Sequence, residues 1–177
     1  REIINTVNIL KAIKRKFTLL HCISIYPTTP EVASMLRIKF LKSLSNSVGF
    51  SDHSNPDLYS YDLSALSTTL GATWIERHFT IFKKNVTKDG VVSVNPSQLK
   101  DLRKAINLPN SQILNYLRKK YNKLQFAKIL GTPNRELTNE ELLNRDYYQG
   151  RFISKTKSGK IVYNWDKSIK PSDITQI

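Results

Sequence analysis

Apolar residues along the chain gather in three short runs that are separated by amphipathic stretches. The runs cover residues 17–24, 46–51 and 72–80, and their length and content are typical of buried β-strands. The stretches between them, residues 30–44 and 58–70, place apolar side chains at helical spacing. Strand, loop and helix therefore alternate, and this order predicts an α/β fold with a parallel sheet or a (β/α)₈ barrel.

The rest of the chain favours helices and irregular structure. Further helices are predicted over residues 1–16, 96–106 and 111–128. A helix-capping pattern, Thr138-Asn-Glu-Glu, lies near the start of an aromatic and polar tail. We divide the chain into residues 1–106, which carry the strands, and residues 107–177, a helical and irregular C-terminal extension.

The length of the chain limits the architecture. A complete (β/α)₈ barrel needs about 250 residues, whereas this chain has 177 and begins with Arg1. We therefore expect a piece of a longer protein, folded as a partial (β/α)₈ barrel of the TIM type.

The charge balance is strongly basic, with 28 lysines and arginines against 14 aspartates and glutamates and a net charge of +14. Such a charge suits a nucleic-acid-binding module. The basic residues are dispersed over the polar faces and ends of the predicted helices, however, which is typical of a solvated surface. The single cysteine, Cys22, rules out an internal disulfide and fits a cytoplasmic protein. No apolar stretch is as long as a membrane span, which needs about 20 residues, so we expect no membrane partner. Because the basic residues are dispersed, we expect no nucleic-acid partner either.

All three histidines lie at or near the ends of the predicted strands. Side chains two residues apart on a strand share a face, and this alternation defines three groups: Cys22, Ser24 and Tyr26; Gly49, Ser51 and His53; and Trp74, Glu76, His78 and Thr80. Asp52 falls on the opposite face. Because the carboxyl ends of barrel strands carry the chemistry, we expect the polar members of these groups to face one cavity mouth.

Two imidazoles on neighbouring strand ends can share a metal ion. His53 and His78 are the candidate ligands, and oxygen-rich surroundings favour Mn²⁺, with Mg²⁺ as the alternative. We expect His21 to be a hydrogen-bonded structural residue and Cys22 to be a small buried hydrophobe. Glu76 could form a surface ion pair, but its phase on the strand argues against exposure and makes it a candidate catalytic residue.

Four segments resemble the sialic acid synthase family in their order and approximate spacing. They begin at His21 (His-Cys-Ile-Ser-Ile-Tyr-Pro-Thr), Gly49 (Gly-Phe-Ser-Asp-His-Ser), Gly71 (Gly-Ala-Thr-Trp-Ile-Glu-Arg-His-Phe-Thr) and Asp89 (Asp-Gly-Val-Val-Ser-Val-Asn-Pro). The pairing of Ser-Asp-His with Glu-Arg-His-Phe-Thr is specific, whereas any one segment alone is a weak signal. The resemblance covers residues 17–106 and implies the last three βα units of a (β/α)₈ barrel.

The resemblance implies a phosphoenolpyruvate-dependent enzyme that forms a carbon–carbon bond. The N-acetylneuraminate, legionaminate and pseudaminate synthases condense phosphoenolpyruvate with an open-chain 2-acetamido sugar and release phosphate; here the sugar is expected to be N-acetylmannosamine or a related N-acetylhexosamine. The implied site residues are the metal ligands His53 and His78, the phosphoenolpyruvate-binding Ser24 and Ser51, and the sugar-lining Tyr26 and Asp89. A homodimer of the full-length protein is implied as well.

Several parts of the family pattern are not seen in this chain. The first five strands, with their phosphate-binding lysines and an active-site glutamate, are expected upstream of residue 1, so we expect the isolated chain to be inactive. The usual small antifreeze-like domain is not recognisable, and Arg151 in the tail is a candidate sugar- or acid-binding residue. The loops around residues 57–62 and 83–89 depart from the family, which leaves the sugar open. The alternatives are a nucleic-acid-binding module and a non-catalytic half-barrel remnant.

Overall fold

The computed structural model describes residues 2–148, 153–163 and 174–175. The chain divides into two compact units, one formed by Phe17–Glu136 and the other by Arg1–Lys16 together with Leu137–Ile177. Among the described residues, no helix combines the length and the apolar character that crossing a membrane requires.

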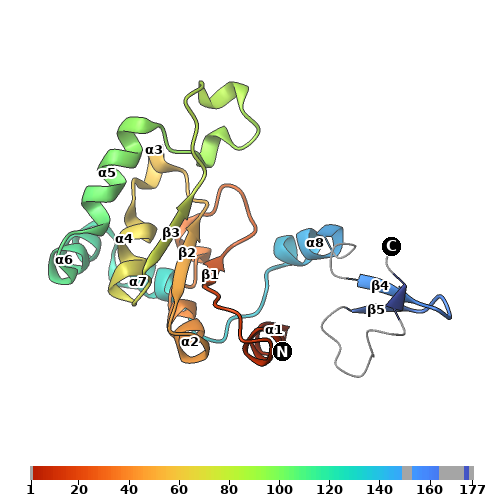
Figure 1. The fold of residues 1–177 in the computed structure, drawn as a ribbon. Helices are drawn as coiled ribbons and strands as arrows, with labels where there is room; N and C mark the ends of the chain where they lie inside the picture. The colour runs from red at the N-terminus through yellow and green to blue at the C-terminus, as the bar shows by residue number, and fades with distance from the viewer. Residues whose placement is uncertain (1, 149–152, 164–173, 176–177) are drawn as a thin grey trace. The chain divides into compact units, whose positions relative to one another are not determined.

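The larger unit is built on a parallel sheet. Its strands are β1 (Leu19–Cys22), β2 (Val48–Asp52) and β3 (Trp74–Arg77), in the order β1-β2-β3 (Figure 1). The register aligns Cys22 with Ser51 and Ser51 with Glu76. The α/β class and the three strands predicted from the sequence are therefore confirmed, although each strand is shorter than or shifted from its apolar run.

Each strand is followed by helical segments. These are η1 (Pro30–Val32) and α2 (Arg37–Leu44) after β1, α3 (Pro56–Tyr59) and α4 (Asp62–Thr69) after β2, and η2 (Lys84–Val86), η3 (Gly90–Val92) and α5 (Pro96–Ile106) after β3. The single helices predicted over residues 30–44 and 58–70 are wrong, because the positive φ angles of Ser34 and Ser60 interrupt both. The helix predicted over residues 96–106 is confirmed.

The basic helix predicted over residues 111–128 is also two helices, α6 (Asn110–Lys120) and α7 (Lys123–Leu130). Tyr121 has an extended backbone between them, and the Asn122 side chain caps α7 by accepting from the Gln125 N–H. Both helices belong to the same compact unit as the sheet, whereas the sequence analysis assigned them to an extension that begins at residue 107.

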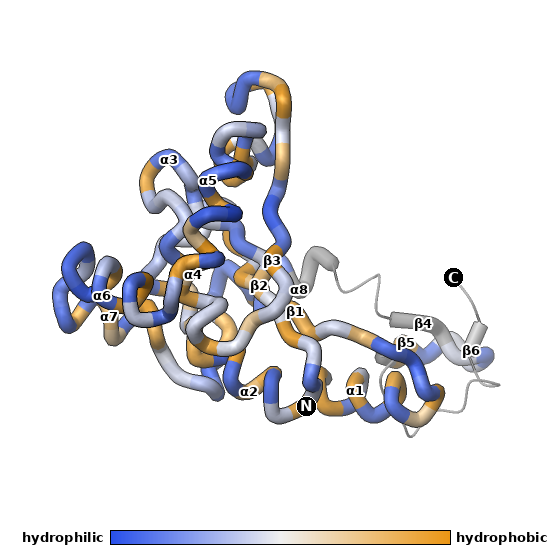
Figure 2. The backbone as a smooth tube through the Cα atoms, turned by 60° about the vertical axis from the view of Figure 1, so that its left-hand side comes forward, coloured by the Kyte–Doolittle hydropathy of each residue, from blue (hydrophilic) through white to orange (hydrophobic). Residues whose placement is uncertain are grey.

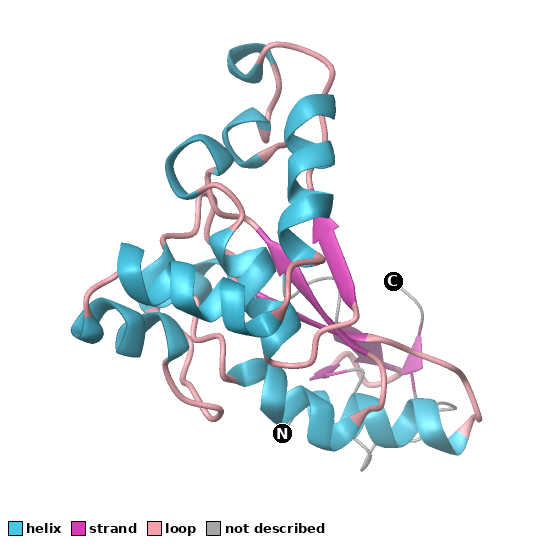
Figure 3. Ribbon diagram, turned by 90° about the vertical axis from the view of Figure 1, so that its left-hand side faces the viewer, coloured by secondary structure: helices cyan, strands magenta, loops and turns pink. Residues whose placement is uncertain are grey.

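The core of this unit lies between one face of the sheet and its helices. Helices α2 and α4 pack against the strands on this face, and Ile23, Ile38, Phe50 and Leu63 are buried there (Figure 3). Figure 2 shows orange, hydrophobic stretches along the three strands and alternating colours along the amphipathic helices. We call this side the covered face.

The other side of the sheet, the open face, carries no such layer within the unit. Leu20 is 37% and Trp74 59% exposed there. Gly49 lies between them in the ladder, and a Cβ atom at Gly49 would come within 2.5 Å of the Trp74 carbonyl oxygen and 2.6 Å of the Leu20 side chain. The missing side chain therefore lets β1 and β3 bring their larger residues close together on either side of β2.

In its described residues, the smaller unit combines two helices with an antiparallel sheet. Its elements are α1 (Glu2–Ala12), α8 (Asn139–Tyr148), β4 (Ile153–Thr156), β5 (Ile161–Tyr163) and β6 (Ile174–Thr175), with the strand order β5-β4-β6. The capping box predicted at Thr138 is confirmed, since the Thr138 hydroxyl accepts from the Glu141 N–H and the Glu141 carboxylate accepts from the Thr138 N–H. Arg151 lies outside the described residues.

Candidate functional site

The two histidines predicted as metal ligands lie side by side at the carboxyl end of the sheet. His53 and His78 directly follow the last residues of β2 and β3, which are paired in register. Their ring centroids are 5.2 Å apart. The Tyr26 ring, beyond the end of β1, lies 3.9 Å from the His53 ring and 5.7 Å from the His78 ring. The structure thus brings one predicted residue from each strand end into a single cluster.

The tautomer of His53 follows from its hydrogen bond. His53 is 4% exposed, and its Nδ1 lies 3.2 Å from the Ile23 carbonyl oxygen. A carbonyl can only accept, so Nδ1 carries the hydrogen and the Nε2 lone pair is left for a ligand. Burial lowers the pKa of the His53 imidazole below its usual value, and the neighbouring His78 lowers it further. Both effects favour the neutral form, which is the form that binds metal.

Asp89 approaches the second histidine from the loop that follows β3. Its Oδ2 lies 3.7 Å from Nδ1 of His78, and both side chains are about one-third exposed, 39% and 34% respectively. An isolated parallel bridge between Phe79 and Val94 returns this loop to the sheet. The sequence prediction that Asp89 belongs to the same site as His78 agrees with this geometry.

Ser51 and Glu76 form a pair on the open face, each two residues before one of the histidines in the chain. They are partners in the strand register, and the Ser51 hydroxyl donates to Glu76 Oε1 at 2.6 Å. Glu76 is exposed, so the expectation that its strand phase would bury it is wrong, because the face to which it points is open. Ser24 is exposed on the segment between β1 and Tyr26.

His21 and Cys22 show how the two faces differ. His21 is buried on the covered face, where its Nε2 lies 2.7 Å from the Ala33 carbonyl oxygen, and its predicted structural role is confirmed. Cys22 is exposed, so its prediction as a buried hydrophobe is wrong. Its Sγ lies 3.7 Å from Nδ1 of His53.

The donor set fits a divalent ion only in part. Two imidazoles with an adjacent carboxylate are a common start of a Mn²⁺ or Mg²⁺ shell, and the hydrogen bond from Nδ1 of His53 is the outer contact that orients a metal-binding imidazole. In the part of the chain that the structure describes, no group of three or more His, Cys, Asp or Glu side chains is placed to hold a metal. Both the binding of a metal and its identity stay predictions.

Behind the histidines lies a polar cluster that the sequence analysis did not use. Asp52 and Arg77, the residues before His53 and His78, form an ion pair of 2.7 Å with side chains 0% and 2% exposed. The sequence signal was present, since both residues sit in strands at positions whose phase turns them toward the core, where an unpaired charge is costly.

The two loops expected to touch the sugar are joined to each other. Asp57, in α3, accepts from Lys84 Nζ at 2.6 Å and from Gln98 Nε2 at 2.7 Å. The hydrogen bond from Lys84 lowers the pKa of Asp57 below its usual value. Loop 57–62 and loop 83–89 are therefore held together at the start of α5.

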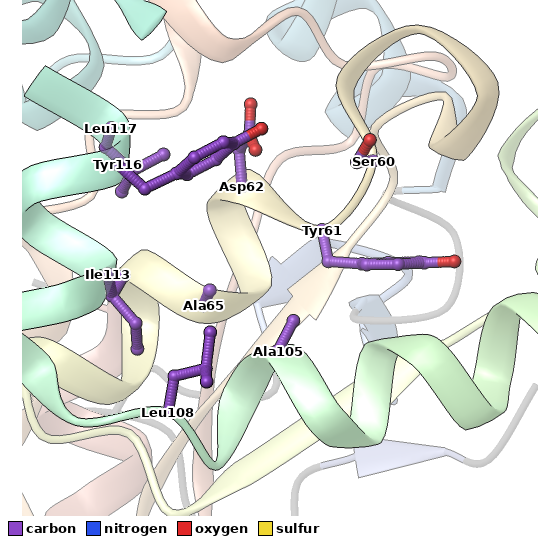
Figure 4. A pocket seen from close by; sticks show the side chains of 9 residues that line it. All are labelled: Ser60, Tyr61, Asp62, Ala65, Ala105, Leu108, Ile113, Tyr116 and Leu117. Carbon is purple, nitrogen blue, oxygen red and sulfur yellow. The ribbon is translucent and has the colours of Figure 1, made fainter. Parts of the chain in front are cut away.

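Hollows also lie in the larger unit. One of about 200 Å³ lies between α4, α5 and α6; Figure 4 shows Ile113, Tyr116 and Leu117 along one side of it. Two others, of about 650 and 500 Å³, include Ile75 and Arg77 of β3 in their linings, and Glu76 lines the smaller of them. Both hollows therefore lie along β3, which is an edge strand of the β1-β2-β3 sheet.

Comparisons with known proteins show what the chain is similar to. The model of the NeuB family matches residues 1–115. The N-acetylneuraminate-9-phosphate synthase of Drosophila melanogaster is 35% identical over 95 residues, which are 52% of this chain and 24% of that protein. The N,N'-diacetyllegionaminic acid synthase of Legionella pneumophila is 30% identical over 163 residues, which are 90% of this chain and 42% of that protein. The chain spans less than half the length of these relatives.

Among solved structures, the spore coat polysaccharide biosynthesis protein SpsE of Bacillus subtilis is similar in fold. The match covers 91% of this chain and 46% of that chain, with a TM-score of 0.65 and 24% sequence identity. At this level of identity the likeness concerns the fold, an α/β arrangement with a parallel sheet.

Proposed function

Because the chain belongs to the NeuB family of sialic acid synthases, we propose that it forms part of an enzyme that condenses phosphoenolpyruvate with an open-chain 2-acetamido sugar aldehyde. The product is a nine-carbon sialic acid-type sugar, and phosphate is released. The observation that carries this proposal is the cluster of His53, His78 and Tyr26 at the carboxyl ends of adjacent parallel strands, the position at which barrels of this class bind substrates.

His53 and His78 are proposed to hold a divalent cation, Mn²⁺ in the first place and Mg²⁺ as the alternative. When bound, the ion would act as a Lewis acid on the aldehyde oxygen of the sugar. The chain's own contribution is to present two imidazoles whose ring centroids are 5.2 Å apart, with Nε2 of His53 left unprotonated by the bond from Nδ1 to the Ile23 carbonyl.

Ser24 and Ser51 are proposed to bind phosphoenolpyruvate. Hydroxyl groups suit its carboxylate and phosphate, which must be oriented before the enolpyruvate carbon attacks. Ser51 is itself oriented, because its hydroxyl donates to Glu76. Glu76 is proposed as a catalytic residue on the same grounds: it is an exposed carboxylate on the open face, directly beside a substrate-binding hydroxyl, and can hold or accept a proton there.

Tyr26 and Asp89 are proposed to line the sugar site. The Tyr26 ring packs against the His53 ring at a tilt of 31° and is 49% exposed, so it presents an apolar surface and a hydroxyl next to the proposed metal ligands. Asp89 offers carboxylate oxygens to sugar hydroxyls beside His78. The hydrogen bond between Lys84 and Asp57 would fix the distance between loop 57–62 and loop 83–89.

We further propose that the sheet is part of a (β/α)₈ barrel. Within the described residues, β1 and β3 each pair with β2 alone, and the open face exposes Leu20 and Trp74. Unpaired edges and an exposed apolar face are what further parallel strands would cover. The activity would then belong to the barrel as a whole. A homodimer of the full-length protein and a cytoplasmic location stay predictions.

The test is phosphate release from phosphoenolpyruvate in the presence of Mn²⁺ and candidate 2-acetamido sugars. The 177-residue chain alone should release none, whereas a longer reading frame that supplies five more βα units should turn over. In that longer protein, His53→Ala and His78→Ala should each lower kcat by about 100-fold or more. His21→Gln, which keeps a hydrogen-bond donor toward Ala33, is the matched control and should retain activity.

Other results would decide between this proposal and its alternatives. Turnover by the 177-residue chain would contradict the barrel part of the proposal. Absence of any neighbouring half-barrel at the locus would leave a non-catalytic remnant. Retention on DNA or RNA that falls steeply with salt would favour a nucleic-acid-binding module instead.

A further inference from the structure

The buried ion pair of Asp52 and Arg77 lies directly behind the two histidines. The two residues are register partners at the last step of the β2–β3 ladder, and each is followed in the chain by one histidine of the site. Their side chains point to the covered face, so they touch neither a substrate nor a metal at the strand ends. Their hydrogen bonds reach the site through the backbone around the histidines.

Asp52 holds the backbone on both sides of His53. Its Oδ1 accepts from the Ser54 N–H at 2.9 Å and from the Ser54 hydroxyl at 2.7 Å. Its Oδ2 accepts from the Ser64 hydroxyl of α4 at 2.5 Å and from Nη1 of Arg77 at 2.7 Å. His53 is thus enclosed between two residues that bond to each other, and this turn is anchored to the helix layer.

Arg77 extends the same network to the second histidine and its loop. Its Nη2 donates to the Ser54 carbonyl at 2.8 Å and toward the Val92 carbonyl at 3.4 Å, and Nη1 donates toward the Ser54 hydroxyl at 3.2 Å. Val92 belongs to η3, which follows Asp89. One guanidinium therefore connects the chain after His53, the chain before His78 and the loop that carries Asp89.

Stability alone does not explain this buried polar network. Nε of Arg77 is buried without a hydrogen-bond partner, and a buried ion pair can often be replaced by apolar residues of similar volume without loss of stability. An apolar pair cannot form directional hydrogen bonds. The fork of a guanidinium fixes several oxygen atoms at set positions, and the oxygen atoms here belong to the backbone around the histidines.

We propose that Asp52 and Arg77 are positioning residues that set the separation and orientation of the His53 and His78 imidazoles. The role rests on the proposed function in so far as those histidines form the functional site. It predicts that loss of the guanidinium changes the two rings of the site and leaves the third histidine of the chain, His21, unchanged. His21 bonds to Ala33 on the covered face, outside the network.

The test uses the three histidines as reporters in the metal-free 177-residue chain, by long-range proton–nitrogen correlation NMR at about pH 8, where imidazoles are neutral. In the wild type, His53 should show one tautomer with its hydrogen on Nδ1. Arg77→Met should shift the ring signals of His53 and His78 and abolish the single tautomer of His53, with no change at His21. The affinity for Mn²⁺, followed by titration, should fall by about 10- to 100-fold.

Two further variants separate positioning from stability. Arg77→Lys keeps the charge beside Asp52 but cannot reach both the Ser54 and Val92 carbonyls, so a folded chain with intermediate ring shifts is expected. Tyr121→Phe removes a different buried hydrogen bond to a carboxylate, that to Asp62 at 2.6 Å, and should lower stability without moving the rings of the site.

The inference is overturned if Arg77→Met and Arg77→Lys leave the ring signals of His53 and His78 as in the wild type, or if Tyr121→Phe moves them equally. If wild-type protein fails to bind Mn²⁺ while the ring signals respond to the Arg77 variants alone, the positioning role is supported and the metal part of the proposed function fails. The two proposals can therefore fail separately.

Discussion

The covered and open faces of the β1–β2–β3 sheet differ sharply, although the same three strands build both. The covered face buries Ile23, Phe50 and Asp52 to 2% exposure or less, whereas the open face leaves Trp74 59% exposed. Side chains alternate along a strand, so neighbours in sequence enter different surroundings. The comparison teaches that the helices of this unit cover one side of its strands and leave the other side exposed.

The polar residues of the two faces differ in what remains for chemistry. On the covered face, Asp52 receives two serine hydroxyls, one N–H and the Arg77 guanidinium, and such a saturated carboxylate serves structure. On the open face and at the strand ends, Glu76 is exposed and Nε2 of His53 keeps a free lone pair according to its tautomer. The polar groups with remaining hydrogen-bonding or ligand capacity therefore lie on the open face and at the strand ends.

The largest loss of stability is expected from removing a large side chain from the covered face. Phe50→Ala should lower the free energy of unfolding by about 3–5 kcal/mol, because it leaves a cavity beneath α2 and α4. Trp74→Ala, on the neighbouring strand but on the open face, is the matched control and should cost about 0.5 kcal/mol. Urea denaturation at neutral pH measures both. Equal losses would contradict the division of the sheet into two faces.

The helix layer itself can be tested at Tyr121, whose hydroxyl donates to the buried Asp62 at 2.6 Å. Tyr121→Phe should cost about 1.5–3 kcal/mol at neutral pH, since the acceptor is charged. Burial and then the bond to Asp62 raise the pKa of Tyr121 well above its usual value. The folded state therefore holds this proton more tightly, and the stability gained is complete below about pH 10 and falls above it.

The measurement is the difference in unfolding free energy between wild type and Tyr121→Phe, followed from neutral to alkaline pH. The difference should shrink as the pH rises above about 10. A difference that stays constant or grows in that range would mean that the hydroxyl is not bonded to the carboxylate in the folded chain.

The smallest loss of stability is expected when one serine hydroxyl is removed from each face of the sheet. Ser64→Ala removes a hydroxyl that donates to Asp52 on the covered face at 2.5 Å, and should cost about 1 kcal/mol, because three other donors to Asp52 remain. Ser51→Ala removes a hydroxyl that donates to Glu76 on the open face at 2.6 Å, and should cost less, because water can replace it at an exposed carboxylate. Thermal unfolding of both variants side by side would reveal the order, and a reversed order would contradict the assignment of the faces.

Local signals predicted the elements that local interactions decide. The helix at residues 96–106 was found because Asn95 and Gln98 cap it within four residues of chain. The helix predicted over 111–128 was wrong, because Tyr121 leaves the helical path at the point where its hydroxyl bonds to Asp62, a residue 59 positions away. A contact of that range leaves no mark on the local spacing of apolar residues.

For the site, the sequence by itself determined which side chains share a face and that His53 and His78 come at the ends of strands, because alternation is a property of the local pattern. Only the tertiary structure decided which face is covered, and with it the exposure of Cys22 and Glu76 and the burial of Asp52 with Arg77. The physical reason is that burial depends on what other parts of the protein pack against a strand, and helices α2 and α4 cover one side alone.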